Sequence, residues 1–322
     1  MKYRIIFQKK FIIFLITMII PFSSGILKSQ MAVVPGDFII EPATLTSLGF
    51  EWHITGDDNR DARVKTEYRP AGEKKWTGAL PLLRIGGELV GRETEHLEYK
   101  VPHMFAGSII DLLPDTEYEC RFTMEDDDGK IREVKTIKVR TRPEPKAYTG
   151  GRVLHVYPAK WKGEKKEPSF TTLQGAYYGS GTGDWSVVRE RTIKPGDIIE
   201  VHAGLYEADR FDYVNPEGVP FYGTYFLTVK ASEAAPVVIR AAGDGEVIFD
   251  GAGAHVLFDV SATENHIFEG LTIRNADIAF YAGNKNINGA VNLTVKNCRM
   301  ENVGEGIITE YAGSRNFYIA DN

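Results

Sequence analysis

The sequence predicts an all-β protein whose C-terminal part is a solenoid. Four segments between residues 236 and 322 are versions of one another. Each alternates apolar and polar residues, as strands do, and places an aliphatic residue two positions before an Asn or Asp. This alignment puts one polar residue of each segment in a common column, namely Asp250, Asn275, Asn297 and Asp321. Successive members of the column are about 22 to 25 residues apart, which is the period of a repeat architecture.

A β-solenoid gives this period a physical reason. One coil contains two or three short strands joined by turns, and its inward aliphatic side chains are buried only when the next coil stacks on them. The expected inward column is Ile248, Ile273, Val295 and Ile319. Each turn leaves backbone groups that need partners, and stacked Asn and Asp side chains can supply them as a ladder along the axis.

Composition sets broad limits on the whole chain. With 322 residues and 43% hydrophobic content, it is expected to fold as two domains once any leader is removed. A net charge of -6 argues against nucleic acid as a partner, because nucleic-acid binders usually carry a basic surface. Oligomeric state does not follow from these residues.

Residues 1–30 have the features of a secretory signal peptide. A basic start that includes Lys2 and Arg4 precedes an apolar run at 11–20, which is too short to span a bilayer comfortably. The alternative is an uncleaved membrane anchor. We therefore expect a secreted or cell-surface protein, with no stable membrane insertion after the signal is cleaved.

Residues 36–143 predict a small all-β domain, since several runs alternate apolar and polar residues between turns rich in Gly, Pro and Asp. The stretch 112–118, Leu-Leu-Pro-Asp-Thr-Glu-Tyr, resembles the tyrosine corner of fibronectin type III domains, and Trp52 would be the matching core aromatic. We expect a fibronectin type III-like β-sandwich, followed by a linker at 144–151 that is rich in Pro and charge. Cys120 and Cys298 fall in different domains and are expected to be buried free thiols.

The third part, 152–322, begins with an expected strand at 152–157. A short helix follows at 169–178, capped by Ser169 or Thr171, and then a strand at 198–202. The stretches 194–206, 236–251 and 266–275 resemble the right-handed parallel β-helix family, which includes pectate lyases and related polysaccharide-degrading enzymes. The resemblance implies a right-handed parallel β-helix over 152–322, with the helix covering its N-terminal end. Because the last ladder position coincides with Asn322, we also expect the chain to continue into further coils.

Candidate site residues follow from which side chains face outward. A lyase that acts on uronates must neutralise the substrate carboxylate, abstract a ring proton and protonate the leaving oxygen. If the ladder faces inward, Arg274 and Lys296 form one outward row with Tyr318 in the adjacent row, and these three are the predicted catalytic residues. The alternative is an ordinary solvated sheet face.

Substrate contacts are predicted at two further places. The stretch 207–225 interrupts the period and is rich in aromatic and acidic residues, which suit stacking on sugar rings; Tyr213 and Tyr222 are its candidates. Packing of this loop against the coil flank is the alternative. Glu310 and Tyr311 could add contacts near the outward row. No metal site is predicted, because His255 and His266 lack ligand spacing and the acidic stretch 126–129 is explained by a hairpin turn.

The expected function is that of a secreted carbohydrate-active protein whose partner is an extracellular, acidic polysaccharide. The resemblance implies a polysaccharide lyase, and it allows Ca²⁺ as a cofactor. Two alternatives stay open: a glycoside hydrolase on the same fold, which needs two carboxyl groups at a defined separation, and a non-catalytic β-helix surface or adhesion protein.

Overall fold

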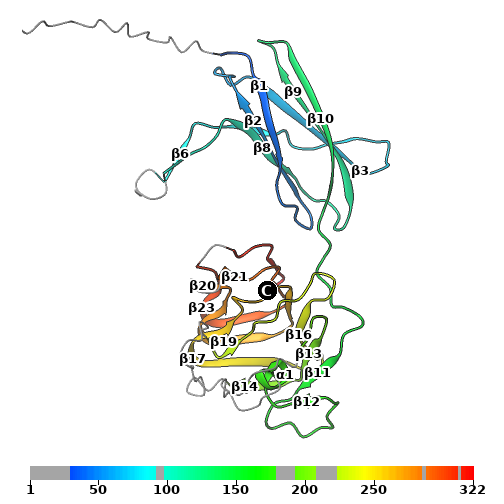
Figure 1. Ribbon diagram of the computed structural model, residues 1–322, viewed down its shortest axis with the longest axis vertical. Coiled ribbons are helices and arrows are strands. Elements are labelled where there is room, and N and C mark those ends of the chain that lie inside the picture. Colours follow the sequence, from blue (N-terminus) through cyan, green and yellow to red (C-terminus); the bar gives the residue numbers. More distant parts are fainter. Residues whose placement is uncertain (1–29, 92–97, 179–192, 208–222, 285–287, 311–312) are drawn as a thin grey trace, which may run out of the picture. The chain divides into compact units, whose positions relative to one another are not determined.

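A computed structural model describes residues 30–91, 98–178, 193–207, 223–284, 288–310 and 313–322 (Figure 1). The chain divides into two compact units, Met1–Pro143 and Glu144–Asn322. Strands form nearly all the regular structure in both, so the prediction of an all-β protein is confirmed. No helix in the described ranges is long and apolar enough to cross a membrane. Almost all of the predicted signal peptide lies outside these ranges.

The first unit consists of two four-stranded antiparallel sheets. In spatial order, one contains β1 (Val34–Ile40), β2 (Leu48–Thr55), β8 (Met104–Ile109) and β5 (Leu83–Ile85). The other contains β10 (Ile131–Arg140), β9 (Glu117–Asp126), β3 (Arg63–Pro70) and β4 (Thr77–Gly78). A separate short hairpin is formed by β6 (Leu89–Val90) and β7 (Tyr99–Lys100).

Both sheets contribute to one core, which makes this unit a sandwich. The predicted core aromatic, Trp52, is fully buried, and the rings of Phe50 and Phe122, from opposite sheets, lie 4.7 Å apart. The tyrosine corner is also present: the hydroxyl of Tyr118 accepts a hydrogen bond of 2.9 Å from the backbone N–H of Leu113. The prediction of a fibronectin type III-like sandwich is therefore confirmed.

The second unit is built on two parallel sheets. The seven-stranded sheet contains, in spatial order, β12 (Ser169–Phe170), β11 (Val153–Val156), β13 (Ile198–Val201), β16 (Val237–Ala241), β18 (His266–Glu269), β22 (Thr294–Lys296) and β24 (Tyr318–Ala320). The five-stranded sheet contains β14 (Gly204–Glu207), β17 (Val247–Asp259), β19 (Thr272–Tyr281) and β23 (Arg299–Ile308), with β15 (Tyr225–Phe226) paired to β17. A small hairpin joins β20 (Gly283–Asn284) and β21 (Asn288–Gly289).

The chain passes from one parallel sheet to the other and back. Strands β13, β16, β18 and β22 are each followed along the chain by one strand of the five-stranded sheet, so each passage adds one strand to both sheets. Inward side chains of both sheets form a single core. Within it the rings of Tyr225, Phe258 and Phe280 stack at spacings of 5.1 Å on three paired strands.

The helix is shorter than predicted. Residues Ser169–Phe170 form β12, and α1 spans Leu173–Tyr178 with all its residues buried. Its cap is Thr172, whose hydroxyl accepts a hydrogen bond of 2.9 Å from the N–H of Gly175, rather than either of the two expected residues. Both cysteines are buried free thiols, as predicted.

The predicted single column of polar residues is wrong, although polar ladders do exist. Asn275 donates to the carboxylate of Asp250 at 2.9 and 3.0 Å, and Asn302 donates to Asn275 at 2.7 Å. By contrast, Asn297 and Asp321 directly follow β22 and β24 of the seven-stranded sheet. The seven-stranded sheet carries the aliphatic–x–polar pattern at 295–297 and 319–321, and the five-stranded sheet carries it at 273–275. Alignment by similarity therefore matched stretches of different sheets.

Candidate functional site

The outward face of the seven-stranded sheet carries a row of charged side chains at one level of consecutive strands. Alternate residues of these strands point into the core, which leaves the residues between them on the opposite face. Strand register places the row members side by side, and we call this set the outward row: His155, Glu200, Arg240, Glu269 and Lys296. The next level of the same face is apolar and includes Ile198, Val238 and Ile267.

Charges in the outward row alternate in sign and form ion pairs. Arg240 Nη2 lies 2.6 Å from Glu200 Oε1, and Lys296 Nζ lies 3.5 Å from Glu269 Oε1. His155 Nδ1 lies 3.7 Å from the other oxygen of Glu200. Neighbouring parallel strands are about 4.8 Å apart, so adjacent members of the row are within reach of one another.

A shallow depression of about 430 Å³ lies at the carboxyl-terminal ends of these strands. It is lined by Glu200, Arg240, Ala241, Ala242, Glu269, Gly270 and Asn297. The side chains of Arg240 and Glu269 are each 35% exposed, so solvent and a ligand can reach both charges. The depression therefore offers carboxylates, a guanidinium and an amide within one concave surface.

Lys296, a predicted catalytic residue, lies in the outward row on β22. Its ammonium also contacts Glu144 Oε1 at 3.3 Å, and its side chain is only 14% exposed. Burial lowers the pKa of Lys296, but the carboxylates of Glu269 and Glu144 outweigh burial and hold the pKa above its ordinary value. Lys296 is thus a permanent cation at neutral pH, which suits charge stabilisation and not proton abstraction.

Tyr318 lies beside Lys296, as predicted. It is on β24, in register with Thr294 of β22, so Tyr318 and Lys296 share one face of adjacent strands. Burial raises the pKa of Tyr318, and the carboxylates of Glu144 and Asp321 raise it further, against the opposing effect of Lys296. The phenol is therefore protonated at neutral pH and is a proton donor in this state.

Arg274 is not in this row, so the predicted pairing of Arg274 with Lys296 is wrong. Arg274 lies on β19 of the five-stranded sheet, between Asp250 and Glu301 in the strand register. Its Nε donates to Asp250 Oδ2 at 2.8 Å. The error has the same cause as the single polar column, since the two cations follow equivalent stretches of different sheets.

Of the predicted substrate-binding residues, the structure describes Glu310 alone, and this residue does not lie in the outward row. Glu310 is exposed beyond the end of β23, where its Oε2 accepts a hydrogen bond of 2.5 Å from the hydroxyl of Tyr281 on β19. Its carboxylate therefore belongs to the side of the five-stranded sheet. The other three candidates lie outside the described residues: Tyr213, Tyr222 and Tyr311.

A pair of buried histidines, His155 of the outward row and His202, was not anticipated. His155 Nδ1 and His202 Nε2 share a hydrogen bond of 3.1 Å, and His202 Nδ1 is 2.6 Å from Asp244 Oδ2. The ring of Tyr157 stacks on His202 with 4.0 Å between centroids. Burial lowers the pKa of His155, which keeps its ring neutral. The two histidines are 47 residues apart, and no local pattern marks them as partners.

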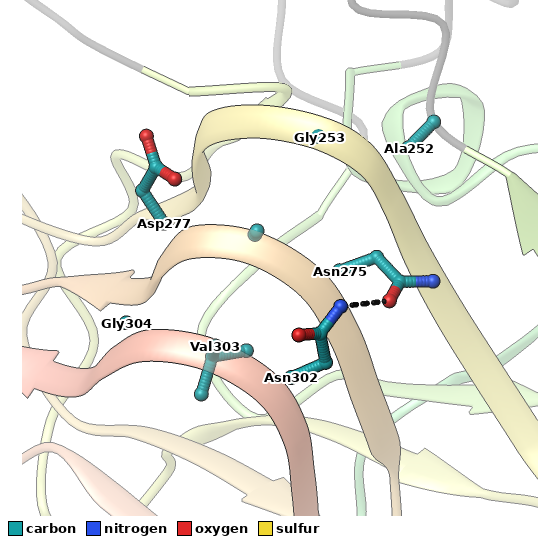
Figure 2. A pocket seen from close by; sticks show the side chains of 8 residues that line it. Ala252, Gly253, Asn275, Asp277, Asn302, Val303 and Gly304 are labelled. Carbon is teal, nitrogen blue, oxygen red and sulfur yellow. Dashed lines mark hydrogen bonds between the residues drawn. The ribbon is translucent and has the colours of Figure 1, made fainter.

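A second polar depression, of about 550 Å³, lies where β17, β19 and β23 turn a corner (Figure 2). Asn275 and Asn302 line it and are hydrogen-bonded to each other, and both adopt the left-handed backbone conformation. Nearby, His255 and Asp277 form a pair at 3.2 Å in which both side chains are 74% exposed. These amides already form hydrogen bonds between the turns of successive strands, so a structural role explains why polar residues line this depression.

The described part of the chain brings potential metal-ligating side chains together in the first unit. Among the described residues, one group brings three such atoms close together: Asp61, Asp126 and Asp128. Asp126 already accepts hydrogen bonds from the backbone N–H groups of Val33 at 2.6 Å and Asp128 at 2.8 Å, which stabilise the turn. The described part of the second unit has no such group of three side chains.

Comparisons with known proteins show no family for this chain. No protein-family model matches the chain, and no curated protein matches it. Among solved structures, the chain is similar to the fibronectin type III domain of human fibronectin type III domain containing protein 3. That similarity has 13% sequence identity and a TM-score of 0.23, and it covers 36% of this chain and 92% of the other.

Proposed function

We propose that the second unit is a right-handed parallel β-helix and that the chain is an exported protein acting on an acidic polysaccharide, as a polysaccharide lyase. The solenoid proposal is supported by the alternation of the chain between two parallel sheets. It is also supported by a third line of parallel bridges, which joins Lys230, Glu264, Val291 and Arg315 of successive passages. Export is proposed from the basic and apolar pattern of residues 1–30.

The outward row beside its depression is the observation that carries the proposed function. Charged groups recur there at the regular spacing of parallel strands, about 4.8 Å, and they line a concave and partly exposed surface. A regular row of this kind suits a polymer with repeated charges better than one small compact ligand. Arg240 and Lys296 are the cations of the row and would face the substrate carboxylates.

The roles in a lyase reaction follow from the charge states. The proton next to a uronate carboxylate would pass to the carboxylate of Glu269, which lines the depression and lies 3.5 Å from Lys296 Nζ. Lys296, which stays protonated, would stabilise the negative charge that develops as this proton leaves. Tyr318, which is also protonated, would donate to the leaving glycosidic oxygen.

A glycoside hydrolase is the second candidate, and one observation favours it. Glu200 and Glu269 are two strands apart in the outward row, with Arg240 between them. Two strand spacings amount to about 9.6 Å, near the upper end of the separation of about 6.5–9.5 Å between the carboxyl groups of inverting hydrolases.

Product analysis separates these candidates. The purified chain is incubated with polygalacturonate, alginate or chondroitin sulfate, with and without calcium, and two products are followed: the ultraviolet absorbance of unsaturated uronates and the appearance of reducing ends. A lyase raises both, whereas a hydrolase raises reducing ends alone. Neither signal on any of these polymers would overturn both enzymatic candidates and leave the non-catalytic surface protein.

Two matched variants locate the site. Lys296→Ala removes a cation from the outward row, and Arg274→Ala removes one from the other sheet. We expect Lys296→Ala to reduce the rate by about 100-fold or more, as expected when one group that stabilises transition-state charge is lost. Arg274→Ala should leave the rate within a factor of a few. Equal losses in both variants would contradict a site on the seven-stranded sheet.

A further inference from the structure

The segment that leads into the second unit runs along the outward face of the seven-stranded sheet. We call residues 144–148 the strap. Ala147 of the strap packs against the apolar cluster of Ile198, Val238 and Ile267, which lies on the same face one level away from the outward row. The strap thus spans several strands of the face to which the substrate site has been assigned.

Glu144 of the strap forms an ion pair with Lys296. Glu144 Oε1 lies 3.3 Å from Lys296 Nζ, while Glu269 Oε1 lies 3.5 Å from the same nitrogen. The two carboxylates differ in how they are held. Glu269 lies on a strand and is directly paired with Lys296 in the register, so it is part of the sheet. Glu144 belongs to no helix or strand, and its side chain is 46% exposed.

We propose that Lys296 is a carboxylate-binding subsite for uronate residues, and that Glu144 occupies it in the free protein as an internal competitor. This inference rests on the proposed function and adds its substrate class and a means of control. When a uronate carboxylate enters, it takes the position of the Glu144 carboxylate. The ammonium then has two carboxylates both before and after the exchange, so no charge is left buried without a partner.

Two physical points support the exchange. First, a tethered group competes at a high effective concentration, so a single exposed glutamate can weaken the binding of a free ligand that has the same chemistry. Second, Glu144 contacts Lys296, and Tyr318 lies on the same face of the neighbouring strand, so a carboxylate in the position of Glu144 lies near both site residues. The Glu144 carboxylate accordingly raises the pKa of the Tyr318 phenol. Glu144 in this structure stands in for the carboxylate of the substrate.

The test measures the affinity of the full chain for oligogalacturonate by calorimetry at fixed ionic strength. Glu144→Gln removes the competing charge and should bind about two- to fivefold more tightly than the wild type, the range that a partly exposed ion pair supports. Glu164→Gln removes the same charge from an exposed position elsewhere in the second unit and should match the wild type. Lys296→Ala should bind at least tenfold more weakly.

A second readout follows the strap itself. If the ligand displaces Glu144, saturating oligogalacturonate should increase amide hydrogen exchange in residues 144–148 while it protects β22 and β18. Equal affinities of the wild type, Glu144→Gln and Glu164→Gln, with binding still lost in Lys296→Ala, would overturn the internal competitor and leave the proposed function intact. Binding unaffected by Lys296→Ala would overturn the subsite, and with it the internal competitor. No binding of oligosaccharides from polygalacturonate, alginate or chondroitin sulfate by the wild type or Glu144→Gln would overturn both proposals.

Discussion

A buried histidine in the second unit should make that unit sensitive to acid. His266 is fully buried, and its Nε2 lies 3.0 Å from the hydroxyl of Tyr177. That hydroxyl accepts hydrogen bonds from the N–H groups of Thr228 at 3.1 Å and Val229 at 2.8 Å, so its own hydrogen is directed at Nε2. The other ring nitrogen is 3.2 Å from the carbonyl of Glu264 and donates to it. Both nitrogens of the neutral ring are therefore satisfied.

The size of the effect follows from the pKa of His266. Burial lowers the pKa to about 4, although the hydrogen bond to Glu264 opposes this. Because an unfolded histidine has a pKa of about 6.5, the unfolded state binds a proton below that pH before the folded state does. The contribution of neutral His266 to the stability of the second unit is therefore fully present well above pH 6.5, and it is lost as the pH falls towards 4. The expected loss from this group is about 1–2 kcal/mol at pH 5.5 and about 2–3 kcal/mol at pH 4.5.

Each unit carries its own probe for the measurement. Cys298 is buried in the second unit and Cys120 in the first, so labelling by a pyridyl disulfide, which reacts in acid, reports the unfolding of each unit separately. Urea titrations at pH 7, 5.5 and 4.5 compare the wild type with His266→Gln. The variant is less stable at every pH, but its free energy of unfolding should fall less steeply with acid. The difference between the two slopes isolates His266, because His155 contributes equally to both proteins.

The matched control is His255→Gln, since the side chain of His255 is 74% exposed. It should keep the pH dependence of the wild type. The role of His266 would be refuted if the free energies of unfolding of the wild type and of His266→Gln, both read at Cys298, changed in parallel between pH 7 and 4.5. It would also be refuted if Cys120 reported the larger difference, because the first unit does not contain His266.

Two further predictions concern backbone conformation and hydrogen bonding. Asn275 has φ of 56°, so Asn275→Ala should destabilise the second unit by about 1–2 kcal/mol more than Asn275→Gly, which loses the same ladder but tolerates that conformation. Urea midpoints read at Cys298 check this, and equal midpoints would contradict it. Tyr118→Phe leaves the N–H of Leu113 without its acceptor and should cost about 1–2 kcal/mol, read at Cys120. A change below a few tenths of a kcal/mol would show that water replaces the hydroxyl.

Local patterns in the sequence determined the architecture at the level of elements. Alternation of apolar and polar residues is a property of each strand by itself, so it identified an all-β chain without knowledge of any partner. Turn chemistry is equally local: the stretch that ends in Tyr118 predicted a tyrosine corner, and the structure contains it. The outward position of Lys296 also followed from its neighbours, because Val295 next to it faces the core.

Only the tertiary structure decided which segments are neighbours. Spacing alone matched Ile273 with Val295, but Val295 pairs with Phe268 and Ile273 pairs with Met300. The same aliphatic–x–polar pattern occurs in both sheets, so the pattern alone leaves this choice open.

The chemistry of the site depends on that choice. The register places Lys296 beside Glu269, and the path of the chain brings Glu144 to it from 152 positions away. Neither contact leaves a local trace in the sequence, since an ion pair requires only that two side chains meet in space. The sequence therefore identified Lys296 as an outward residue, and the tertiary structure decided which charges it meets. The predicted inward column is wrong at two of its positions: Val247 and Phe249 lie in the core in place of Ile248, and Ile319 is 46% exposed.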